Sequence, residues 1–79
     1  MGWLWSARRN EAQDRLAELV REAALAAHRD GDNDAATALY DSAQRMRRAI
    51  GPKIWRTLAT ADEAELRAIA ERMAERARQ

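Results

Sequence analysis

Four aspartates near the middle of the chain have the spacing that comes nearest to a chemical site. Asp30, Asp32 and Asp34 alternate along the segment HRDGDNDAATALYDSA, and Asp41 follows them. Together they match the first three ligand positions and the closing acid of an EF-hand calcium loop. The acids alone would therefore allow a calcium site.

The residues between these aspartates favour a turn between two helices instead. An EF-hand loop needs glycine at its sixth position for a sharp bend, and this chain has Ala35 there. An apolar helical pattern also begins inside the would-be loop, and a ligand loop would have to unwind it. We predict that Gly31 ends one helix and that Asp32 or Asn33 caps the next, so we assign no metal site.

Residues suited to catalysis are few and scattered. His28 is the only histidine, and the chain has no cysteine. Ser6 and Ser42 lack a convincing arrangement with a histidine and a carboxylate for nucleophilic catalysis. The three glycines are isolated, so they form no phosphate-binding loop. The sequence predicts a protein that is not an enzyme, with no catalytic residues and no cofactor.

Three segments have the apolar periodicity of amphipathic helices, and nothing indicates a strand. The first helix is predicted over 10–29, with Asn10 as its N-cap and Leu25 on the face opposite its apolar stripe. The second is predicted over 33–49, because Gly51 and Pro52 then stop it. The apolar stripes comprise Ala12, Leu16, Leu19, Val20, Ala23 and Ala27 in the first helix and Ala36, Leu39, Tyr40, Ala43, Met46 and Ile50 in the second.

A third helix is predicted over 61–77, after a packed helical connector over 51–60. Thr60 and Glu63 have the spacing of a capping box, and Glu63 and Arg67 have the orientation that favours an i,i+4 ion pair. The apolar stripe comprises Leu66, Ile69, Ala70, Met73 and Ala77. The expected fold is all-α: one domain over 1–79, a three-helix bundle with a short helical connector between helices 2 and 3, preceded by a tryptophan-rich segment over 1–9.

The segment from Gly31 to Ala43 resembles the second half of a tetratricopeptide repeat, with a Gly-Asp turn followed by alanine, tyrosine and alanine at helical steps. Ala24 lies where the first helix of such a repeat has a small residue. The resemblance covers about residues 20–48. A single repeat of this kind within three helices is similar in shape to an MIT domain. That resemblance implies a helical bundle that binds a partner's helix in a groove between its own helices.

The composition predicts a thin core in a nearly neutral chain. Nineteen of the 79 residues are alanine, none is phenylalanine, and the formal net charge is +1. So small a domain has marginal stability, which association with a partner can supplement. No apolar run reaches the roughly 20 residues that span a bilayer, so we expect a cytoplasmic protein. The abundance of arginine and alanine is typical of GC-rich bacterial or phage genes.

These features predict a protein–protein interaction module, such as a small adaptor, an assembly factor or a phage inhibitor of a host protein. Its predicted partner-binding residues are large apolar side chains near the N-terminus, on the outer face of helix 1 and beside the inter-helix groove: Trp3, Leu4, Trp5, Leu25, Leu39 and Tyr40. For Trp3, Leu4 and Trp5 the scarcity of other large apolar residues favours packing back onto the bundle, and docking to a partner is the alternative. The partner is another protein or, as a homo-oligomer, a second copy of the chain.

The alternative is a nucleic-acid-binding accessory protein that uses the basic segment 45–56. Its cationic side chains would contact phosphates while a tryptophan stacks on a base. The residues in this hypothesis are Arg45, Arg48, Lys53, Trp55 and Arg56. Nearly neutral total charge and the acidic turn at 30–34 favour the protein partner.

Overall fold

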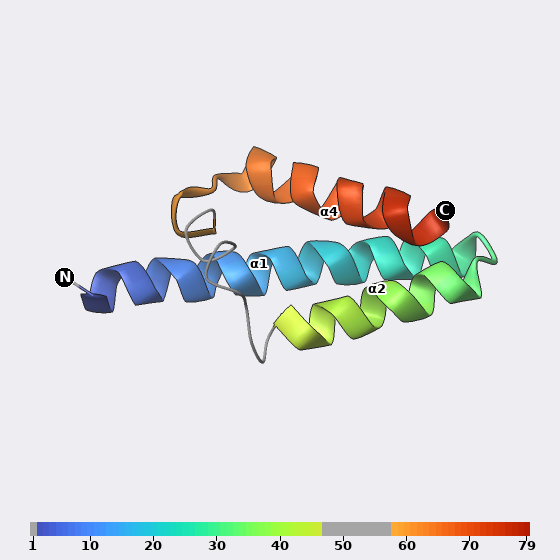
Figure 1. Cartoon of the computed structure of the whole chain (residues 1–79), viewed down its shortest axis with the longest axis horizontal. Helices are drawn as coiled ribbons and strands as arrows, with labels where there is room; N and C mark the ends of the chain where they lie inside the picture. Colours follow the sequence, from blue (N-terminus) through green and yellow to red (C-terminus); the bar gives the residue numbers. More distant parts are fainter. Residues whose placement is uncertain (1, 47–57) are drawn as a thin grey trace.

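The chain forms an all-α helical bundle (Figure 1), as the sequence predicts. A computed structural model describes the backbone of residues 2–46 and 58–79 and the side chains of 10–46 and 58–79. Three long helices account for most of these residues: α1 (Gly2–Arg29), α2 (Asn33–Met46) and α4 (Glu63–Arg78). Residues 58–60 are also helical, and the described ranges contain no strand.

Helix α1 is the longest element and begins earlier than predicted. Its 28 residues span about 42 Å at the usual helical rise. The predicted start at Asn10 is wrong, because the helix already includes Gly2 and Asn10 lies inside it. Trp3, Leu4 and Trp5 therefore belong to a helix rather than to a separate segment. The first turns of α1 extend past the ends of α2 and α4 (Figure 1).

The turn between α1 and α2 has the geometry that the aspartate-rich segment predicts. Gly31 adopts a φ of +82°, which glycine tolerates and other residues rarely do. Its N–H donates to the carbonyl of His28 at 3.0 Å, and the N–H of Asp32 donates to the carbonyl of Ala27 at 2.9 Å. This pair of bonds is a Schellman motif, which satisfies the last carbonyls of α1.

Helix α2 begins immediately after this turn because Asp32 caps it. The Asp32 carboxylate accepts a hydrogen bond from the N–H of Ala35 at 3.1 Å. The predicted start at residue 33 is confirmed. The described part of α2 ends at Met46, so the predicted end at 49 and most of the predicted connector lie outside the described residues. Within that connector, 58–60 are helical, as expected.

Helix α4 begins two residues later than predicted, with a different cap. The carboxylate of Asp62 accepts a hydrogen bond from the N–H of Glu65 at 2.9 Å, so Asp62 is the N-cap. The predicted capping role of Thr60 is wrong, since Thr60 belongs to the preceding helical residues. The predicted pair between Glu63 and Arg67 is confirmed, with a nitrogen–oxygen distance of 3.0 Å.

The core lies where α1 contacts both α2 and α4, and alanine supplies much of it. Its largest fully buried side chains are Leu16, Val20, Leu39 and Leu58. The predicted stripes are buried or half-buried wherever they are described. The structure adds four core residues that no single stripe contained: Ala17, Ala24, Ala35 and Leu58. Two of them, Ala17 and Ala24, lie on α1, which has neighbours on two sides.

Candidate interaction surface

The junction of α1 and α2 contains a shallow groove beside Tyr40. Alanines at this junction leave the groove open, since their methyl groups fill little of the space between two helices. Its volume is about 220 Å³. Tyr40 is half-buried there, and Arg21 makes no ion pair among the interactions of the described residues. The lining residues are Ala17, Arg21, Tyr40, Ala43 and Gln44.

A second groove runs between α1 and α4, and its floor is apolar. Its volume is about 260 Å³. Leu19 and Ala70 are each 5% exposed, and Ala23 and Ala74 are half-buried. Three charged residues border the floor: Glu22, Arg67 and Glu71.

The charges on this second groove are predominantly acidic. Glu22 and Glu71 are exposed, one on each helix, and neither takes part in an ion pair or hydrogen bond of the described residues. Arg67 is already engaged by Glu63. The two free carboxylates therefore give the α1–α4 groove a negative potential, whereas Arg21 makes the α1–α2 groove positive.

Leu25 is 45% exposed, the only large hydrophobic side chain that is exposed in the described parts of the chain. This agrees with its predicted place on the outer face of the first helix. Arg21, one turn before it, lines the α1–α2 groove, and Glu22 lines the α1–α4 groove. Leu25 therefore lies on the ridge of α1 between two grooves of opposite charge.

The structure separates two residues that the sequence analysis placed on one surface. Tyr40 lines the α1–α2 groove, whereas Leu39 is 1% exposed and borders a third cavity between α2 and α4. Leu39 is thus a core residue, while Tyr40 and Leu25 remain accessible from the same side of α1. The backbone of Trp3, Leu4 and Trp5 is helical, and their side chains lie outside the described set.

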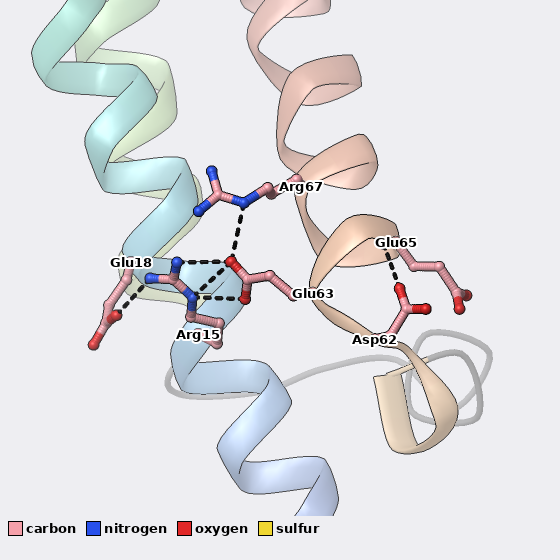
Figure 2. Close-up of polar contacts among 6 residues, drawn as sticks. All are labelled: Arg15, Glu18, Asp62, Glu63, Glu65 and Arg67. Carbon is pink, nitrogen blue, oxygen red and sulfur yellow. Dashed lines mark hydrogen bonds and ion pairs between the residues drawn. The ribbon is translucent and has the colours of Figure 1, made fainter.

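An ion-pair network joins α1 to the start of α4 (Figure 2). The Nε and Nη2 atoms of Arg15 donate to the two carboxylate oxygens of Glu63 at 2.9 and 2.7 Å. Nη1 of Arg15 donates to Glu18 at 3.1 Å. These hydrogen bonds from Arg15 lower the pKa of the Glu63 carboxyl, because they favour its charged form. The network positions α4 and has the bidentate geometry of a structural contact.

Two polar contacts hold the other ends of the helices. The side-chain amide of Gln13 donates to the carbonyl of Met46, which places the end of α2 beside α1. Arg78 pairs with Asp30 at 3.0 Å, which places the C-terminal end of α4 beside the α1–α2 turn. The start of α4 is therefore held to α1 by the pair of Glu63 with Arg15, and its end is held by the pair of Arg78 with Asp30, the residue after α1.

Three of the four aspartates in this segment have separate structural partners rather than a common focus. Asp32 caps α2 and Asp30 pairs with Arg78. Asp41 lies within α2 and pairs with Arg45 at 2.9 Å. No group of three or more histidine, cysteine, aspartate or glutamate side chains within 10–46 and 58–79 could hold a metal ion.

Of the five residues in the nucleic-acid hypothesis, Arg45 is the one that the structure describes. Its guanidinium is highly exposed, and the pair with Asp41 balances its charge. Arg48, Lys53, Trp55 and Arg56 lie outside the described residues, so this hypothesis remains a prediction.

The α1–α4 groove was not among the predicted surfaces. The sequence predicts Leu19, Ala23 and Ala70 only as members of the core stripes. The available signal was the place of Leu19 and Ala70 at the edges of their stripes, but the pairing of α1 with α4 was needed to join them.

Comparisons with known protein families, with curated proteins and with solved structures find no match to this chain. None of the helices in the described ranges combines the length and the apolar character needed to cross a membrane.

Proposed function

We propose that this chain is a non-catalytic protein–protein interaction module whose binding surface is the outer side of α1. The observation that carries the proposal is the arrangement around Leu25. An exposed leucine lies on a ridge with an open groove on each side. Apolar anchors next to preformed grooves are the usual elements of a protein-binding surface.

The chemistry of the grooves supports binding rather than turnover. Alanines form much of their floors, and the polar residues at the rims are mainly arginine and glutamate that face solvent. Such rims select partners by charge, while an apolar floor contributes most of the affinity. The resemblance to a tetratricopeptide hairpin and to MIT domains supports the same binding style.

Affinity capture with the full chain tests this proposal. We expect the wild-type chain to retain a protein partner from a nuclease-treated bacterial lysate, and Leu25→Asp to lose most of it. Leu25 is exposed, so the substitution should leave the fold intact, which circular dichroism verifies. Ala68→Asp, at an exposed position on α4, is the matched control and should retain the partner.

Two results would contradict the proposal. One is recovery of nucleic acid alone, with binding that falls steeply as salt is raised and that Arg48→Ala weakens, because counterion release dominates such binding. The other is equal retention of the partner by wild type and Leu25→Asp.

A further inference from the structure

The α1–α4 groove and the start of α1 are complementary in chemistry. The groove has an apolar floor with free carboxylates on both sides, at Glu22 and Glu71. Residues 2–9 of α1 have the sequence GWLWSARR, with three large apolar residues followed by Arg8 and Arg9. The groove therefore combines an apolar floor with acidic rims, and the start of α1 combines apolar residues with two cations.

The chain cannot bring these two elements together within one molecule. Residues 2–29 form one continuous helix, so its beginning points away from the groove beside Leu19 and Ala23. About 16 residues separate the centres of the two regions, which corresponds to about 24 Å along the helix axis. The last described residue of α2, Met46, contacts α1 at Gln13, and the first residue of α4, Glu63, contacts it at Arg15. Residues 2–9 of α1 extend past these two contact points (Figure 1).

We propose that a second copy of the chain fills this groove with its own residues 2–9, so that the protein forms a dimer. This inference deepens the proposed function, since it names a second copy as one partner. In a two-fold dimer each copy supplies one helix end and one groove, so both sites are equivalent. The apolar residues of the helix end cover the groove floor, and its arginines offset the charge of Glu22 and Glu71.

Association is expected to weaken with salt, because exposed ion pairs are screened. It should not vanish at high salt, since the apolar floor remains. Nucleic acid would be repelled from the same groove by its carboxylates. A monomeric chain that leaves this groove to another protein is the competing outcome.

Sedimentation equilibrium on the full chain tests the proposal. We expect a dimer with a Kd below about 1 mM. The double reversal Glu22→Arg with Glu71→Arg should weaken it about tenfold, because two attractive contacts become repulsive. Reversing Arg8→Glu and Arg9→Glu should weaken it similarly.

Combining all four reversals restores opposite charges and should recover most of the wild-type affinity. The matched control, Asp14→Arg with Glu65→Arg, changes one exposed acid on α1 and one on α4 away from the groove, and it should leave Kd within about twofold. Circular dichroism verifies that each variant is folded.

A measurement on the wild-type chain covers the case in which a variant does not fold. In a mixture of isotopically labelled and unlabelled chains, we expect intermolecular NMR contacts from tryptophan side chains to the methyl groups of Ala23 and Ala74. A monomer at about 1 mM, a dimer without these contacts, or a failure of the four reversals to restore affinity would overturn the proposal. A monomer that still captures a different protein through Leu25 would overturn this inference alone.

Discussion

Replacing the buried Ala24 of α1 with leucine tests whether alanine is what lets these helices approach closely. Ala24 is 0% exposed and belongs to a core that also contains Ala27 and Ala35, each 0% exposed. Leucine adds three carbon atoms at this fully buried position, so neighbouring side chains or helices must shift to accommodate them. Overpacking of this kind costs about 1–3 kcal/mol. A chain of this length has about 4–12 kcal/mol of stability in total.

Urea unfolding followed by far-UV circular dichroism measures this cost. With a slope of about 1 kcal/mol per molar for so small a domain, the midpoint should fall by about 1–3 M in Ala24→Leu. The matched control is Ala68→Leu, on the exposed face of α4, where the free energy of unfolding should change by less than about 0.5 kcal/mol. An Ala24→Leu chain at least as stable as the wild type would refute close alanine packing as the basis of the fold.

Three further predictions concern the turn and the start of α4. Gly31→Ala should destabilise the chain by about 1–2 kcal/mol through backbone strain alone, since φ is +82° and a Cβ would meet nothing within 4 Å. Gly31→Asn should lose less stability, because asparagine tolerates this backbone conformation better than alanine. Equal urea midpoints for Gly31→Ala and wild type would refute this. Asp62→Ala should cost about 1 kcal/mol in the same assay, whereas Asp62→Asn should retain most of the cap, and equal losses from both would exclude capping. Glu63→Gln should lower stability at neutral pH. Folding lowers the pKa of Glu63, so the stability that its carboxylate contributes is present above the unfolded pKa of about 4.3 and is lost as pH falls through the folded pKa. The free energies of unfolding of Glu63→Gln and wild type should therefore converge in acid. A difference that persists there would contradict the lowered pKa.

The helices and their buried faces could be predicted because the local pattern fixes them. Leu16, Val20 and Leu39 recur at helical spacing and are buried. Gly31 marked the turn because only glycine readily takes its backbone conformation. The exposure of Leu25 also followed from the wheel, since its neighbours at helical spacing are charged.

The errors arose where two local signals competed. Asn10 is a good N-cap, but no glycine or proline lies in residues 3–9 to prevent the helix from starting earlier. Thr60 and Asp62 are both good caps, but Thr60 belongs to the helical residues 58–60, so Asp62 caps α4. Local patterns do not decide between neighbouring caps such as Thr60 and Asp62, because helix ends fray and shift by one or two residues.

The surfaces between helices could not be predicted from single stripes. Arg15 and Glu63 are 48 positions apart in the chain, so their ion pair depends on how α4 packs on α1. The α1–α4 groove depends on the same packing. Its residues belong to the apolar stripes of two separate helices, and neither stripe alone indicates which helix packs beside it.

A three-residue turn, Asp30, Gly31 and Asp32, joins α1 and α2 as neighbours in both sequence and space, while α4 reaches them from far along the chain. The α1–α2 hairpin can therefore form early and persist while α4 detaches, since α4 is attached to it mainly by a few apolar residues and two exposed ion pairs. Native-state hydrogen exchange should divide the molecule accordingly, with the amides of α4 exchanging through a partial opening and the middle of α1 protected until the whole chain unfolds.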